Sequence, residues 1–147
     1  MTADAALQML LDRAAVHDVL LRYARGVDCK DIDLVASCFT PDAAYEGALA
    51  RSDIRQALPR LREAMDRYAS TLHFLGNATI EVTGDRASSE TYAIAYHCPR
   101  TGDRQYVVAV RYLDELVRHD GRWLITRRRV CREWERYDTV VMEASDG

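Results

Sequence analysis

A phenol, a carboxylate and an imidazole stand near the ends of expected helices and strands. They are Tyr23 and Asp28 in the string RYARGVDCKD and His73 in the string TLHFLGN. An imidazole is the side chain best suited to proton transfer near neutral pH, and a carboxylate on one ring nitrogen leaves the other nitrogen free as a base. A phenol can supply a proton to a leaving group. These residue types favour an enzyme that moves protons on a small organic molecule.

The end of the first expected helix decides whether Tyr23 and Asp28 can serve one site. On a continuous helix, residues five positions apart point about 140° apart. We expect Gly26 to end the helix as a left-handed cap, which would turn Asp28 onto a loop near Tyr23. A structural interpretation, with Tyr23 in the core and Asp28 in a turn, fits the same spacing.

His73 lies near the start of a long expected strand. The alternation of side chains along that strand determines which face of the sheet His73 lies on. Strict alternation puts His73 on the more polar face, opposite Phe74 and Ile80. A β-bulge at Gly76 or Asn77 would switch the register midway, because glycine within a strand often marks a bulge. Without a bulge, His73 fits a pocket less well.

Five further residues are candidates for the same pocket. His97 shares a strand face with Ala93 and Ala95, whose small side chains leave space beside a titratable group. The alternative is that His97 closes its strand at the solvent edge. Tyr45 could donate a hydroxyl, and Arg132 could stabilise an oxyanion, although both residue types are more often packing or surface residues.

The elements that must position these residues follow from periodicity and breaks. We expect a long amphipathic helix over 5–25, a short helix capped by Asp31 that runs through 38, and a brief strand over 43–46. A third helix should begin at Ser52 and be split or kinked at Pro59. Four strands should follow as an antiparallel meander, over 71–82, 87–98, 104–118 and 122–137.

This order of elements predicts one α+β domain over residues 1–147, with a frayed tail at about 139–147. Long strands twist and curl, so the sheet and the helices across its open side should form a cone with a pocket.

Composition excludes some partners. The chain has 147 residues, of which 48% are hydrophobic and 29% charged, and a net charge of -3, so neither nucleic acid nor a membrane surface is expected as a partner. The cluster of Arg127, Arg128, Arg129 and Arg132 alternates with acidic residues and should form a solvated or salt-bridged stripe.

Localisation and cofactor use follow from what the chain lacks. There is no signal-peptide pattern and no long apolar stretch, so we expect a cytoplasmic protein. The four cysteines form no C-x-x-C pair, which favours reduced, mostly buried thiols. No phosphate loop, metal cluster or dinucleotide motif occurs, so no cofactor and no metal are expected.

The strings DRAAVHDVLLRYARGVD, TLHFLGN and YLDELVRHDGRWLITRRRV, in this order, resemble the SnoaL-like family of the nuclear transport factor 2-like superfold. That family includes scytalone dehydratase, bile-acid 7α-dehydratase and a hexachlorocyclohexane dehydrochlorinase. The resemblance implies a cone-shaped α+β barrel that forms dimers or trimers. It also implies a catalytic dyad of Asp28 and His73, assisted by Tyr23 and Arg132 as in the bile-acid enzyme, and by Tyr45 and His97 as in scytalone dehydratase.

Together these observations predict a cofactor-independent lyase that eliminates water from a small, largely apolar cyclic molecule. His73 would take the proton and Tyr23, Tyr45 or His97 would return one. The same groups could serve an isomerase of the ketosteroid type or a polyketide cyclase. A different class remains open, a non-catalytic ligand-binding module or an assembly module like the small subunit of a ring-hydroxylating oxygenase.

Overall fold

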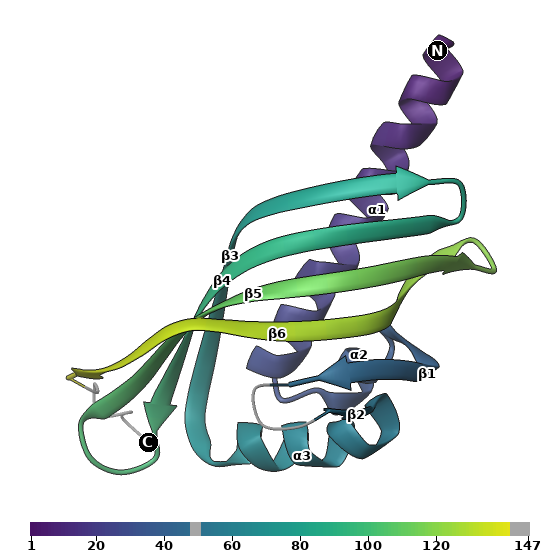
Figure 1. Cartoon of the computed structure of the whole chain (residues 1–147). Coiled ribbons are helices and arrows are strands. Elements are labelled where there is room, and N and C mark those ends of the chain that lie inside the picture. Colours follow the sequence, from purple (N-terminus) through teal and green to yellow (C-terminus); the bar gives the residue numbers. More distant parts are fainter. Residues whose placement is uncertain (48–50, 142–147) are drawn as a thin grey trace.

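The computed structural model describes residues 1–47 and 51–141. Three helices lie against one face of a curved six-stranded sheet (Figure 1). The elements in chain order are α1 (Ala3–Asp28), α2 (Ile32–Ala36), β1 (Phe39–Glu46), β2 (Arg51–Asp53), α3 (Ile54–Asp66), β3 (Tyr68–Thr83), β4 (Arg86–Pro99), β5 (Arg104–His119) and β6 (Arg122–Thr139).

The sheet has the strand order β2-β1-β6-β5-β4-β3. Strands β3 to β6 form the expected antiparallel meander, each paired with the next. Strand β1 then returns to lie parallel to β6, a pairing that the sequence did not predict. The predicted fold class, an α+β cone of helices packed on a curved and mostly antiparallel sheet, is confirmed.

Helix α1 crosses the concave side of the sheet and buries one stripe of apolar residues. Thr2 caps its start by accepting a hydrogen bond from the amide of Ala5. The buried stripe repeats at helical spacing and packs into the core, with Val16, Val19, Leu20, Tyr23 and Val27 as its apolar members.

The prediction that Gly26 ends α1 is wrong. The helix continues through Gly26 to Asp28, and the left-handed backbone falls on Lys30, at φ 56°. Gly26 instead allows α2 to approach closely, because a Cβ at this position would lie 2.8 Å from Cγ2 of Val35. The requirement for glycine is therefore steric contact between two helices, which local sequence does not reveal.

The two shorter helices differ slightly from expectation. Asp31 caps α2 by accepting from the amide of Leu34 at 2.9 Å, as predicted, but α2 ends at Ala36. Helix α3 is capped by Asp53, because Ser52 belongs to the unpredicted strand β2. Pro59 lies inside α3 without splitting it.

A β-bulge in β3 turns His73 toward the interior. Pairing with β4 shifts between Leu75 and Ala78, so that one extra residue lies in β3 at the Gly76–Asn77 step. Before the shift His73 and Leu75 are partly buried and Phe74 is exposed, whereas after it Ile80 is buried. The predicted change of face is confirmed.

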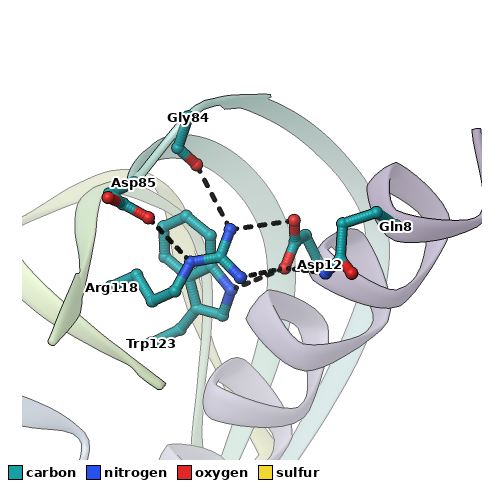
Figure 2. Close-up of polar contacts among 6 residues, drawn as sticks. All are labelled: Gln8, Asp12, Gly84, Asp85, Arg118 and Trp123. Carbon is teal, nitrogen blue, oxygen red and sulfur yellow. Dashed lines mark hydrogen bonds and ion pairs between the residues drawn. The ribbon is translucent and has the colours of Figure 1, made fainter. Parts of the chain in front are cut away.

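A polar cluster fixes α1 against two hairpin turns (Figure 2). The carboxylate of Asp12 accepts two hydrogen bonds from Arg118, at 2.7 and 2.9 Å, and Trp123 points its indole nitrogen at the same carboxylate. Arg118 also bonds Asp85 in the β3–β4 turn. Helix α1 is 26 residues long, and its N-terminal turns extend beyond the edge of the sheet (Figure 1).

Two smaller expectations need correction. Of the four cysteines Cys38 is buried, Cys98 and Cys131 are partly buried and Cys29 is exposed, so most are not fully buried. The start predicted for the frayed tail, at about 139, is too early, because Thr139 ends β6 and the backbone amide of Val140 donates to the carbonyl oxygen of Asp103. Residues 142–147 lie outside the described part. None of the described helices has the length and apolar character needed to cross a bilayer.

Candidate active site

Asp28 and His73 meet where the end of α1 touches β3. Nδ1 of His73 lies 2.7 Å from Oδ1 of Asp28, and the backbone amide of His73 donates to Oδ2 at 2.8 Å. Thr71 donates its hydroxyl to Oδ1 at 2.9 Å. Three donors thus converge on one carboxylate, while the His73 side chain is only 8% exposed.

The protonation state of Asp28 follows from these contacts. Burial works to raise the pKa of the Asp28 carboxyl, but the hydrogen bonds and charge of His73, together with Thr71, outweigh it and lower that pKa below its ordinary value. Asp28 is therefore ionised at neutral pH and accepts the Nδ1 proton. This leaves Nε2 of His73 as the ring nitrogen that can accept a proton from a substrate.

Tyr23 and Asp28 serve the same region although α1 is continuous between them. Tyr23 points into the core from the buried stripe and lines a cavity. Asp28 lies on the last turn, beside β3, and reaches the cavity through the His73 ring. Tyr23 and Asp28 point in different directions from α1, but the His73 ring lies between Asp28 and the cavity, so no break in the helix is needed.

The cavity has a volume of about 230 Å³ and is lined by both polar and apolar side chains. Ala95 lines it as predicted, whereas Ala93 is buried in the core and is not among the lining residues. The polar lining comes from Tyr23, Tyr45, Tyr68, Thr71, His73, His97, Tyr106, Tyr112 and Arg132, and the apolar lining from Val27, Leu61, Ala64, Met65, Ala95, Val108, Val110 and Val130.

His97 lies in the cavity beside His73 and not at a bare strand edge. The two ring centroids are 5.9 Å apart, and the rings of Tyr68 and Tyr106 flank His97 at 4.8 and 5.2 Å. Burial lowers the pKa of the His97 imidazole, and the neighbouring His73 lowers it further. His97 is consequently neutral at pH 7, and can donate one hydrogen bond or accept one.

Arg132 also lines the cavity, but its charge is balanced at the rim. Its Nη1 lies 2.7 Å from Oε2 of Glu135, and the hydroxyl of Tyr106 donates to the same oxygen at 2.7 Å. The carboxylate thus ties the arginine to a tyrosine. Tyr45 lies deeper, with its hydroxyl oxygen 3.4 Å from that of Tyr23.

Sequence reasoning missed a buried ion pair beneath these tyrosines. Arg128 and Asp114 form two hydrogen bonds of 2.7 Å, with side chains 1% and 0% exposed. The guanidinium carbon lies 4.0 Å from the ring centroid of Tyr23 and 4.4 Å from that of Tyr112. The expected solvated or salt-bridged stripe is correct for Arg127, which is exposed and pairs with Glu46, whereas Arg128 is salt-bridged but buried.

A signal for this pair was present in the strand alternation. Asp114 lies between Tyr112 and Leu116 on the buried face of β5, where an ionised carboxylate requires a cation. The face of Arg128 was harder to assign, because the pairing of β5 with β6 shifts between Glu115 and Leu116. That irregularity carries no glycine or proline to mark it.

The buried phenols of Tyr45 and Tyr112 are protonated at neutral pH. Burial raises the pKa of Tyr45 well above its ordinary value, and the neighbouring Tyr23 reinforces this. Burial likewise raises the pKa of Tyr112, although the nearby Arg128 opposes the shift. The bottom of the cavity therefore presents hydroxyl groups beside a compensated cation. Within 1–47 and 51–141, no three histidine, cysteine or acidic residues gather as ligands for a metal ion.

The chain is similar to known proteins in sequence and in fold. A family model described as a SnoaL-like domain matches residues 8–129. An uncharacterized protein from Mycobacterium tuberculosis (strain H37Rv) is 32% identical over 124 residues, which cover 80% of this chain and 82% of that protein.

Two solved structures illustrate the shared fold. A scytalone dehydratase-like protein from Novosphingobium aromaticivorans superposes with a TM-score of 0.80 at 20% identity, covering 90% of this chain and 91% of the other. A hexachlorocyclohexane dehydrochlorinase from Novosphingobium barchaimii superposes with a TM-score of 0.81 at 20% identity, covering 95% and 98%. At 20% identity these neighbours show that the fold is shared.

Proposed function

We propose, since the chain belongs to the SnoaL-like domain family, that it is a lyase that eliminates water from a small, largely apolar cyclic substrate without a cofactor. The observation that carries this proposal is the bond between Asp28 and His73 at the wall of a cavity lined by both apolar and polar side chains. A base with its orienting carboxylate is costly to bury, and a buried pair of this kind is characteristic of proton transfer.

The first step is removal of a proton from carbon. Nε2 of His73 takes a proton from a carbon next to an activating group, and Asp28 stabilises the imidazolium that forms. The electron pair of the broken C–H bond becomes the new double bond. The C–O bond of a hydroxyl on the adjacent carbon breaks, and that oxygen leaves as water once it receives a proton.

Tyr23 is our first choice for the proton donor. Its hydroxyl lies 3.4 Å from the hydroxyl of Tyr45, which can donate a hydrogen bond to it. Its ring packs against the guanidinium of Arg128. A cation beside the ring stabilises a phenolate that forms when the proton leaves. His97 is neutral and its ring centroid lies 5.9 Å from that of His73, so it is suited to hydrogen-bond the leaving oxygen.

The cavity supports a particular class of substrate. At about 230 Å³ it is smaller than the roughly 300–1,000 Å³ of sites for drug-sized ligands, so it suits a molecule of about one or two small rings. Arg132, the arginine in its lining, and Arg128, buried behind the tyrosines, are each paired with a carboxylate. Because the described lining residues include no unpaired arginine or lysine to bind an anionic group, the favoured substrate is uncharged, and Arg132 and Tyr106 can contact its polar end.

The test is hydrogen exchange in deuterated water. The protein is incubated with a panel of cyclic ketones and hydroxylated rings, and deuterium incorporation and loss of water are followed by mass spectrometry. We expect exchange with wild type, and with His119→Ala as a control for an exposed histidine, but not with His73→Ala.

The outcomes separate the functional classes. Exchange with loss of water supports the lyase, whereas exchange followed by double-bond migration or ring closure would assign the same dyad to an isomerase or cyclase. If wild type exchanges no more than His73→Ala across the panel, the enzyme proposal fails and a non-catalytic module remains.

A further inference from the structure

Two histidines lie next to each other in the cavity, on adjacent strands. His73 on β3 pairs with Ala95 on β4, and Thr71 pairs with His97, so the two imidazoles are diagonal neighbours in the sheet. Long side chains in this relation are within reach of each other when they lie on one face. Both rings line the cavity, and the small side chain of Ala95 lies opposite His73 and keeps the space beside the rings open.

Each ring uses the same nitrogen to contact the protein. Nδ1 of His73 lies 2.7 Å from Oδ1 of Asp28, and Nδ1 of His97 lies 3.4 Å from the backbone carbonyl oxygen of Tyr106. An imidazole that donates from Nδ1 carries its lone pair on Nε2. In both rings Nε2 is therefore the atom that can bind a ligand in the cavity.

Histidines that bind metal ions in proteins have these same contacts. A ring that ligates an ion through one nitrogen almost always donates its other N–H to a carboxylate, a backbone carbonyl or water, which fixes the tautomer and the direction of the ring. Here Asp28 supplies a carboxylate to His73, and Tyr106 supplies a carbonyl to His97. Imidazole is a favoured ligand of zinc, copper and nickel ions.

The separation of the two rings suits a shared ion. Their centroids lie 5.9 Å apart and their planes are turned by 74°, so the rings are not stacked face to face. With Zn–N bonds of about 2.0–2.1 Å, two imidazoles on a tetrahedral ion have centroids about 5 Å apart, so the rings need to approach by about 1 Å. We expect His97 to make this movement, because its contact with the carbonyl is long, whereas His73 is held closely by Asp28.

We propose that Nε2 of His73 and Nε2 of His97 together bind one divalent transition-metal ion of the zinc type, and that this ion reversibly inhibits the protein. Resident zinc sites have three or four protein ligands, so an ion on two nitrogens should exchange readily, with water in its other positions. The bound ion uses the lone pair with which His73 would accept a proton. The inhibition rests on the proposed function, but the metal site does not, because binding is measured without substrate.

The first experiment locates the ion. Zn²⁺ is titrated into protein with isotope-labelled histidine rings, and the ring nitrogens are followed by NMR. We expect one Zn²⁺ per chain, with the Nε2 signals of His73 and His97 shifted and those of the other two histidines, His17 and His119, unchanged. Mg²⁺, which prefers oxygen ligands, should shift none of these signals.

Substitutions test the two ligands and the carboxylate that orients one of them. In calorimetric titrations, His97→Gln and His73→Gln should each weaken Zn²⁺ binding by more than about tenfold, and Asp28→Asn by about 10–100-fold. His119→Ala, at an exposed histidine, and Cys29→Ser, at an exposed thiol, are the controls and should bind Zn²⁺ as wild type does. Circular dichroism checks that each variant is folded. His97→Gln tests the site even if His73→Gln fails to fold, because His97 makes only a long contact with the protein.

Hydrogen exchange connects the ion to the reaction. Saturating Zn²⁺ should abolish exchange by wild type, and a chelator should restore it, whereas any exchange by His97→Gln should resist the same Zn²⁺ concentration. Three results would each overturn the proposal: a wild type that binds no Zn²⁺, undiminished binding by His97→Gln, or full exchange at saturating Zn²⁺. If wild type binds Zn²⁺ through both rings but exchanges hydrogen with no substrate in the panel, the proposed reaction fails and the metal site stands.

Discussion

One carboxylate, that of Asp28, holds both the side chain and the backbone of His73. Oδ1 lies 2.7 Å from Nδ1 of the ring, and Oδ2 accepts the backbone amide at 2.8 Å. The same group therefore fixes the tautomer of the proposed base and the position of β3 at the end of α1. Loss of the charge should affect both.

Asp28→Asn should lower the exchange or elimination rate by about 10²–10⁴-fold, the range typical of general base catalysis. The amide keeps the shape of the carboxylate but cannot stabilise an imidazolium. The measurement is the steady-state rate on the substrate found by deuterium exchange. Asp120→Asn, at a side chain that is 89% exposed, is the control. A wild-type rate in Asp28→Asn would remove Asp28 from the mechanism.

Asp12→Asn should lower the free energy of unfolding by about 1.5–3 kcal/mol, the range for hydrogen bonds to charged groups. The variant loses the two-point contact with Arg118 that joins α1 to the hairpin turns (Figure 2). Urea unfolding provides the measurement. Asp85→Asn is a matched control, because Asp85 bonds the same arginine but is 77% exposed, and should cost less than about 1 kcal/mol. Equal losses would contradict a special role for Asp12.

The contribution of Asp12 should also depend on pH. Its hydrogen bond with Arg118 outweighs burial and lowers the pKa of the Asp12 carboxyl below its ordinary value. A lowered folded-state pKa stabilises the protein fully above the unfolded value of about 3.9, and that stability is lost as the pH falls through the folded value. The gap between wild type and Asp12→Asn in urea should therefore be larger at pH 7 than at pH 3. A gap that grows on acidification would show the opposite linkage.

Gly26→Ala should destabilise the protein by about 1–3 kcal/mol, although alanine is the better helix former. The new methyl group would lie 2.8 Å from Cγ2 of Val35 and 3.0 Å from its backbone nitrogen. Gly76→Ala is the matched control, since its methyl group meets its nearest neighbour, a Tyr92 backbone oxygen, at 3.7 Å. Thermal or urea unfolding should separate the two variants. A more stable Gly26→Ala protein would mean that α2 can move away.

Arg128→Met should cost about 3–5 kcal/mol, because it leaves the Asp114 charge buried without a partner. Replacing both residues, as Arg128→Met with Asp114→Leu, should recover much of that loss. Arg127→Met, at an exposed guanidinium, is the control. Double-mutant analysis of urea unfolding gives the coupling energy. Additive effects of the two buried substitutions would argue against a paired interaction.

The His97 ring should titrate below the ordinary histidine value of about 6.5, because burial and the neighbouring His73 both oppose its charge. Ring signals in an NMR titration, assigned with His97→Gln, provide the measurement, and free imidazole in the same tube is the reference. A midpoint above that of free imidazole would mean that His97 is a cation in the cavity and would remove it as a neutral donor.

The four long strands, and the β-bulge that turns His73 toward the core, could be predicted from the sequence. Alternation gives each strand two faces, and the glycine at position 76 marked where those faces exchange. The pairing of β1 with β6 was not readable, because a parallel contact between the first and last strands has no local signal.

Gly26 and Arg128 show the limits of local patterns. A glycine after a helical run predicts a cap, but here the helix continues because the contact with Val35 needs the space. An arginine among arginines suggests a solvent-exposed surface, but Asp114 on a distant stretch of chain decides otherwise. In both cases the deciding neighbour comes from another element.

The direction of α1 has a practical consequence for experiments. The helix has 26 residues, which at 1.5 Å each span about 39 Å, and Asp28 lies at its far end. A peptide tag, fluorophore or surface linker joined ahead of Thr2 is therefore held well away from the proposed catalytic dyad. Immobilising the protein through its amino terminus should leave the mouth of the cavity accessible to reagents.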